Sequence, residues 1–312
     1  MRLLARSLQL FFPRESPSRP PDSKAAPMYF LKFILCPLIV LMLAACGKHP
    51  QQANGHDLRA CRPHLNGIID GEKVVGSGRT SLIVGFAGTA VTSGGMVNYL
   101  FGPDPGSLAG PSTSKLSIRN AEDVRSLAIA REIAAEHDAT FVFPNKSPAQ
   151  GSQWPAATPG TGFFQDAVAY TDCLGEGFSR VFTLGYSNGG QTAGSVALAT
   201  EKSGGVLFAA GQSQFDAATH VGISDQEVPE RLADLSVVFF YYEGDETISS
   251  GLRNFRSRYL PHIRFSHMMR VVPKKISGTG IWPRHLTPMG ATANGAPIRK
   301  AIRQLLDFPG RH

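Results

Sequence analysis

The amino-acid sequence predicts one α/β domain with a doubly wound, mainly parallel sheet and helices on both faces. Short apolar runs rich in β-branched and aromatic residues alternate with helical patterns over residues 72–312. One of these runs leads through a Gly-x-Ser-x-Gly turn directly into a helical segment. With 42% hydrophobic and 18% charged residues in 312, the chain can build a sizeable core and is not globally disordered.

Six apolar runs are the predicted strands. They are apolar at nearly every position instead of alternating with polar residues, which indicates strands that are covered on both faces. Their residue ranges are 81–86, 139–143, 180–184, 206–210, 236–242 and about 263–272. The helical patterns between them favour parallel neighbours, because a crossover helix connects parallel strands.

Four helices are predicted, over residues 120–137, 163–174, 188–200 and 297–308. Asn120 is a favoured N-cap residue, and Pro297 suits the first turn of the last helix. Residues 89–117 are rich in Gly, Pro and Ser and are predicted to form a long loop. Loops of this length often carry function.

The segment Gly185-Tyr186-Ser187-Asn188-Gly189 matches the pattern G-x-S-x-G at the junction of a predicted strand and a predicted helix. In this setting the serine lies on a sharp turn beside the free N–H groups of the helix start. The flanking glycines allow a neighbouring chain segment to pass close by. We therefore predict that Ser187 is a nucleophile, against the alternative of a serine that merely begins a helix.

A nucleophilic serine needs a base, and the base needs a carboxylate to orient it. In this kind of fold the chain order is serine, acid, histidine. The acids Glu243, Asp245 and Glu246 follow the predicted strand 236–242. We predict Asp245 as the acid, with Glu243 as the reserve candidate and a solvated loop carboxylate as the alternative for each.

His285 is the predicted base, because it lies between the last predicted strand and the last predicted helix. The alternative is a surface loop histidine. His262 and His267 fall within or at the edge of the last predicted strand and are interpreted as packing or surface residues.

The oxyanion that forms during acyl transfer needs backbone N–H donors. Asn188, the residue after the nucleophile, is expected to supply one. The other is expected from the loop after strand 81–86, and we assign it to Thr89. A plain glycine turn at Gly88 is the alternative.

Residues 1–45 are predicted to be a secretory signal and not part of the fold. An uninterrupted apolar stretch over residues 33–45 follows Lys32 and is too short to span a bilayer comfortably. The sequence Leu-Ala-Ala-Cys-Gly over residues 43–47 resembles the lipobox of bacterial lipoproteins. This resemblance implies cleavage before Cys46 and lipidation of that residue, which anchors the chain to a membrane.

Three further boundaries follow from this reading. Met28 directly precedes the signal and has the position of a natural start, which makes residues 1–27 an over-long start or a true extension. Residues 46–71 are polar and irregular and are predicted to be a tether. The predicted domain then covers residues 72–312.

Two cysteines, Cys61 and Cys173, remain after the signal and the lipidated residue are set aside. In an oxidising compartment they can form a disulfide, and the alternative is two unrelated buried thiols. Residues 1–45 also hold six basic and two acidic residues, and removing their net +4 from the total of +7 leaves +3. With no basic run or nucleic-acid-binding motif, the charge does not indicate nucleic acid.

Residues 163–190 resemble the poly(3-hydroxybutyrate) depolymerase, feruloyl esterase and acetylxylan esterase group of α/β-hydrolases. The most specific match is Ser-Asn-Gly-Gly at residues 187–190. Phe-Pro-Asn at 143–145 resembles the group's Y-P-D, and residues 245–248 match its D-x-x-[VI] around the acid. The resemblance implies an α/β-hydrolase fold and carboxylic ester substrates.

Two departures concern the predicted site. The group has His-Gly before its oxyanion residue, where this chain has Ala87-Gly88. It also places the catalytic histidine before Trp-Pro, whereas His285 follows Trp282-Pro283. The assignment of His285 therefore rests on its position in the fold and not on the motif.

The sequence thus predicts a secreted, lipid-anchored serine hydrolase that cleaves small or polymeric esters, on the bacterial outer membrane facing the periplasm or the cell surface. No metal or cofactor is expected, because the nine histidines form no metal-binding spacing and no dinucleotide fingerprint is present. The alternatives are a non-catalytic binding lipoprotein on the same scaffold and a serine peptidase.

Overall fold

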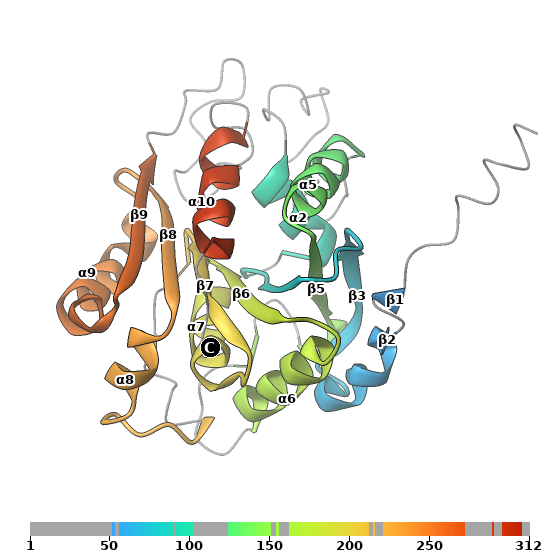
Figure 1. Ribbon diagram of the computed structural model, residues 1–312, viewed down its shortest axis with the longest axis horizontal. Helices are drawn as coiled ribbons and strands as arrows, with labels where there is room; N and C mark the ends of the chain where they lie inside the picture. The colour runs from blue at the N-terminus through green and yellow to red at the C-terminus, as the bar shows by residue number, and fades with distance from the viewer. Residues whose placement is uncertain are drawn as a thin grey trace, which may run out of the picture. The chain divides into compact units, whose positions relative to one another are not determined.

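A mainly parallel sheet organises the chain in the computed structural model (Figure 1). The model describes residues 52–53, 56–89, 91–102, 124–150, 154–155, 162–211, 215, 221–271, 289 and 295–307. Within these ranges seven strands form one sheet in the order β3-β5-β4-β6-β7-β8-β9. The strands are β3 (Ile69–Val75), β4 (Ser81–Phe86), β5 (Ala139–Lys146), β6 (Arg180–Tyr186), β7 (Ser203–Ala209), β8 (Ser236–Tyr242) and β9 (Phe265–Val271).

The strand pairing is parallel throughout except at one edge. β3 pairs antiparallel with β5, and every other pair in this sheet is parallel. Two strands, β4 and β8, have the predicted bounds, and the other four predicted strands are extended, displaced or shortened by a few residues. A short two-stranded sheet of β1 (Gln52–Ala53) and β2 (His56–Asp57) lies outside the main sheet.

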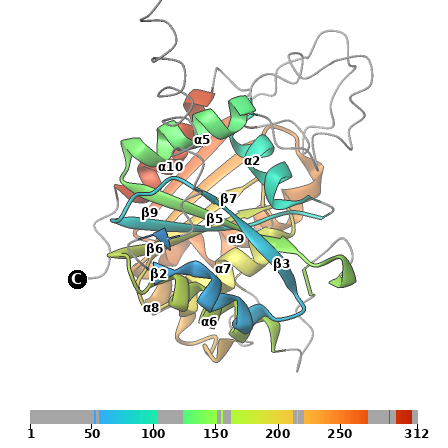
Figure 2. The same cartoon turned by 90° about the vertical axis from the view of Figure 1, so that its right-hand side faces the viewer.

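Helices cover both faces of the main sheet, as predicted for a doubly wound fold (Figure 2). One face carries α2 (Ser93–Phe101), α5 (Val124–Glu136) and α10 (Ala296–Leu306). The other carries α6 (Phe163–Gly175), α7 (Gly189–Ala199) and α8 (Val228–Ala233). The remaining helical segments are η1 (Leu58–Leu65), η2 (Pro148–Gln150), η4 (Glu246–Ile248), α9 (Ser249–Arg258) and η5 (Leu260–His262).

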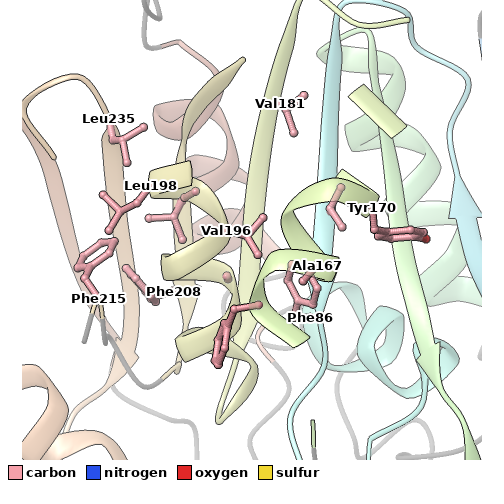
Figure 3. Close-up of a cluster of buried hydrophobic side chains, with 14 of the residues drawn as sticks. Phe86, Ala167, Tyr170, Val181, Val196, Leu198, Phe208, Phe215 and Leu235 are labelled. Carbon is pink, nitrogen blue, oxygen red and sulfur yellow. The ribbon is translucent and has the colours of Figure 1, made fainter. Parts of the chain in front are cut away.

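Two buried hydrophobic clusters, one on each face of the sheet, form the core. Figure 3 shows part of the cluster under α6 and α7, where Ala167, Tyr170 and Val196 lie close to strand residues such as Phe86. The strands are apolar on both faces because each face packs against helices. The predicted fold class, a doubly wound and mainly parallel α/β sheet, is confirmed.

Residues 58–71, which the sequence analysis placed in a tether, are folded. They form η1 and the start of β3, and Leu58, Cys61 and Leu65 are buried against the core. The sequence of this segment is largely polar because only one side of η1 is apolar and because β3, at the sheet edge, is only partly buried. The polar composition of this segment therefore led to the wrong prediction of a tether, although η1 packs against the core.

Residues 93–101, which were predicted as part of a long loop, form helix α2. The Thr92 side chain caps this helix by accepting a hydrogen bond from the Gly95 N–H at 3.1 Å. Apolar residues from Met96 to Phe101 then bury the helix against the sheet. Burial overrides the low helix propensity of Gly94 and Gly95.

Cys61 and Cys173 form a disulfide that joins η1 to α6, with 5.7 Å between their Cα atoms. Beside it, the Arg62 guanidinium donates three hydrogen bonds to the carboxylate of Glu72 of β3, at 2.8, 2.9 and 3.2 Å. These links attach the N-terminal segment to the sheet edge.

None of the helices within the described ranges is both long and apolar enough to cross a membrane.

The disulfide gives the first testable prediction. It closes a loop of 112 residues, so replacing both cysteines with serine is expected to lower the free energy of unfolding by about 2–5 kcal/mol. Urea denaturation of the purified protein, followed by circular dichroism, measures this. Addition of a reductant should lower the wild-type midpoint and leave that of the double variant in place; equal midpoints for all samples would contradict the prediction.

Candidate active site

Ser187 lies at the turn between β6 and α7 and has a left-handed φ of 52°. A non-glycine residue pays a conformational cost for this φ and keeps it only where its surroundings impose it. Here the Ser187 N–H donates to the carbonyl of Ala210, which follows β7, and the Gly190 N–H donates back to the Ser187 carbonyl, at 3.2 and 3.0 Å. The predicted strand–turn–helix arrangement around Ser187 is therefore present.

The chain segment after β4 passes directly beside this turn. A Cβ atom on Gly189 would lie 2.1 Å from the carbonyl oxygen of Phe86, and one on Gly88 would lie 2.8 Å from the Cβ of Ser187. Both positions therefore exclude any side chain. The close approach brings Ala87 and Gly88 next to the turn that carries the serine, and Thr89, the expected oxyanion donor, is the next residue in the chain.

The backbone N–H groups of Asn188 and Thr89 make no hydrogen bond within the part of the chain that the structure describes. Asn188 is the N-cap of α7, so its N–H belongs to the helix start, where the backbone dipoles favour negative charge. Unpaired N–H groups beside a strained serine are the arrangement that binds an anionic oxygen. The geometry thus brings three of the predicted residues, Ser187, Asn188 and Thr89, into one area.

Two side chains hold the carbonyl groups of the same loop. The indole of Trp154 donates to the Ala87 carbonyl at 2.8 Å, and the ammonium of Lys146 donates to the Gly88 carbonyl at 2.6 Å. The Lys146 ammonium also lies over the Trp154 ring, 5.1 Å from its centroid. Burial lowers the pKa of Lys146 to about 8.

Lys146 and Trp154 are not among the site residues predicted from the sequence. For Lys146 a signal existed, since Asn145 and Lys146 are polar residues directly after the apolar run of β5. In open α/β sheets, functional groups gather at the carboxyl ends of the strands. Trp154 carries no such signal, because it lies outside every predicted strand and helix.

The two candidate acids after β8 have different surroundings. Asp245 is 6% exposed, and its negative charge adds to burial in raising the pKa of Tyr242. Glu243 is partly exposed and forms an ion pair with Arg270 of β9 at 2.9 Å. A carboxylate that orients a base must be shielded from water, so this geometry favours Asp245 over Glu243.

Some of the other residues named from sequence lie outside the described ranges, and the rest are exposed. His285 and Cys46 lie outside the described residues, as does the signal at 1–45. His262 and His267 were interpreted as packing or surface residues, and both are exposed. Within the described ranges, no group of three or more His, Cys, Asp or Glu side chains is placed to hold a metal ion.

Sheet and turn together define the class of this protein. The parallel sheet, the antiparallel edge strand and a strained serine between a strand and a helix are the features of the α/β-hydrolase fold. The chain therefore has this fold, and Ser187 lies at the strained turn between β6 and α7.

No protein-family model matches the chain, and no curated protein does. Among solved structures, a predicted CIB-like hydrolase from Thermoplasma acidophilum is 13% identical with a TM-score of 0.43, over 77% of this chain and 96% of that one. A dienelactone hydrolase from Anabaena variabilis is 11% identical with a TM-score of 0.42, over 75% and 91%. Carboxyl esterase 2 from the mycorrhizal fungus Tuber melanosporum is 16% identical with a TM-score of 0.40, over 73% and 78%.

These similarities are too distant to bear on the activity of the chain.

The contact between Gly88 and Ser187 yields a testable prediction. Gly88→Ala is expected to slow the reaction of Ser187 with a fluorophosphonate probe about tenfold or more, because the new Cβ pushes the loop away from the serine. Its cost in the free energy of unfolding is expected to be about 1–3 kcal/mol. Labelling rates and urea denaturation measure the two effects.

Gly222→Ala is the matched control. Gly222 is exposed, has a φ of 80° and has no atom within 4 Å of an added Cβ, so the substitution strains the backbone without a clash. It should leave the labelling rate unchanged. Wild-type labelling by a folded Gly88→Ala protein would contradict the inferred contact.

Proposed function

We propose that the chain is a serine hydrolase that cleaves carboxylic esters through an acyl-enzyme, with Ser187 as the nucleophile. The observation that carries the proposal is the left-handed φ of Ser187 in a turn against which the Gly88 backbone packs. A serine that only begins a helix needs neither feature, because N-cap residues have ordinary extended backbone angles. Strained residues of this kind cluster at active sites.

In the proposed mechanism, His285 accepts the proton of the Ser187 hydroxyl as the serine oxygen attacks the ester carbonyl. Asp245 holds His285 in the required tautomer and stabilises its positive charge. The N–H groups of Asn188 and Thr89 bind the oxyanion. His285 then protonates the leaving alcohol, and the same sequence with water as the nucleophile releases the acid and restores the serine.

The preference for esters rests on the resemblance of residues 163–190 to the depolymerase and esterase group. The same catalytic groups also serve peptidases, so the choice of substrate is a separate proposal. We propose small or polymeric esters as substrates.

We also propose that the mature chain is secreted and attached to a bacterial membrane through a lipid on Cys46 alone, facing the periplasm or the cell surface. The lipobox-like sequence at 43–47 supports this. The Cys61–Cys173 disulfide supports an oxidising compartment, because such bonds persist there.

The nucleophile and base are tested by labelling the purified protein with a fluorophosphonate and mapping the modified peptide. Wild type should be labelled on Ser187, and both Ser187→Ala and His285→Ala should reduce labelling by at least about 10³-fold, because serine is inert without its base. Ser179→Ala and His262→Ala, which change exposed residues of the same types, are the controls and should react normally.

A folded wild-type protein that is not labelled would refute the enzyme and favour a binding lipoprotein. Labelling that persists in His285→Ala would refute the base. If wild type is labelled, its hydrolysis rates on a panel of acyl esters and amides then decide between esterase and peptidase.

The acid is tested by comparing Asp245→Asn with Glu243→Gln. Asp245→Asn should lower kcat for an ester about 10⁴-fold, because the amide favours the wrong histidine tautomer. Glu243→Gln breaks a surface ion pair worth at most about 1 kcal/mol and should change kcat less than about threefold. The reverse pattern would make Glu243 the acid. Thermal unfolding of both variants checks that they fold.

A further inference from the structure

We propose that Lys146 is a positioning residue that orients and polarises the peptide between Gly88 and Thr89, so that the Thr89 N–H becomes a stronger oxyanion donor. The inference rests on the proposed function and adds a residue to it. Lys146 touches neither the serine nor the substrate in this proposal, and it acts through the backbone of the loop.

The sheet register brings Lys146 to the loop. β4 and β5 are parallel neighbours, and their pairing ends at Val84 and Val142, so the segments that lie four residues beyond these partners leave the sheet at the same edge. The residues at these positions are Gly88 and Lys146. The ammonium meets the Gly88 carbonyl at 2.6 Å, and the pairing of the two strands brings this contact within reach.

The carbonyl of Gly88 and the N–H of Thr89 belong to one peptide group. In a planar trans peptide these two groups point in opposite directions, so holding the oxygen fixes the direction of the N–H. A charged donor on the oxygen also polarises the peptide and strengthens the bond that its N–H can donate. The Val91 N–H donates to the same oxygen at 3.2 Å and fixes the peptide from a second side.

Trp154 packs beneath the loop and the Lys146 ammonium and limits their movement. Its indole bonds the carbonyl of Ala87, and its ring stacks on Phe163 of α6 and meets Phe86 edge-on. Because the same ring underlies the Lys146 ammonium, it limits the positions that the flexible lysine can take. Two consecutive peptides of the loop are thus held by side chains on their oxygen atoms.

The charge of Lys146 is set by its surroundings. The described groups that meet its ammonium are a backbone carbonyl from the loop after β4 and the Trp154 ring, and no carboxylate within the described ranges pairs with it. On its own strand, Asn145 is neutral, and its side-chain oxygen accepts from the Ser93 N–H of α2. Burial without an opposite charge lowers the pKa of Lys146 to about 8, so the ammonium loses its proton in the mildly alkaline range.

The experiment measures the rate of Ser187 labelling by a fluorophosphonate between pH 6 and about pH 10 in wild type, Lys146→Met and Lys146→Arg. Wild type should lose rate above about pH 8 as the ammonium deprotonates. Lys146→Met should be roughly tenfold slower at pH 7 and lack this alkaline decline, since it has no charge to lose. Lys146→Arg should retain rate beyond pH 8, because its cation does not titrate there.

Lys202→Met is the matched control. The Lys202 ammonium also bonds backbone carbonyls, those of Glu176 and Phe178 among them, but it lies at the opposite end of the sheet from Ser187. This variant should label at the wild-type rate with the wild-type pH profile. Thermal unfolding of each variant separates loss of folding from loss of reactivity.

Two results would overturn the role of Lys146: a folded Lys146→Met protein that labels at the wild-type rate, or an alkaline decline that persists in Lys146→Arg. Complete loss of labelling in both Lys146 variants, with normal labelling of His285→Ala, would make Lys146 the base instead. A wild-type protein that is not labelled at all refutes the proposed function itself, which separates that failure from failure of the Lys146 role.

Discussion

The site depends on the close contact between two chain segments, the turn from β6 into α7 and the loop after β4. At Gly189 and Gly88 an added Cβ would collide with backbone or with the serine itself. This contact holds Ser187 at its left-handed φ, and Ala210, which accepts the serine N–H, is also left-handed, with a φ of 46°. Strain at two non-glycine residues is tolerated because the packed sheet around them leaves no alternative position.

The parallel sheet converts this local constraint into a site. The ends of β4, β5, β6 and β8 reach the same edge, so residues distant in sequence are delivered together. The loop after β4 supplies N–H groups, the end of β5 supplies an ammonium, and the turn after β6 supplies the serine. The buried carboxylate of Asp245 follows β8. In the proposed enzyme, each group has one function and a separate strand to support it.

Most of the sheet was predictable from sequence, because strands buried on both faces appear as continuous apolar runs. The bounds of β4 and β8 were predicted without error. The failures lie where burial is one-sided or local propensity is poor. Residues 58–71 are polar on their exposed side, and α2 contains two glycines in its first turn, so neither segment has a clear pattern. In both cases tertiary packing supplies the stability that the local sequence lacks.

The sequence by itself determined the fold class and the position of Ser187, because the strand–turn–helix pattern and its glycines are local in the chain. It also predicted Asp245 as the acid with Glu243 as the reserve candidate, and it left open whether the two remaining cysteines form a disulfide. Only the tertiary structure joined Cys61 to Cys173, buried Asp245 while leaving Glu243 in an exposed ion pair, and brought Lys146 and Trp154 to the loop at Gly88. These outcomes depend on strand order and register, which bring distant residues together and which no local pattern encodes.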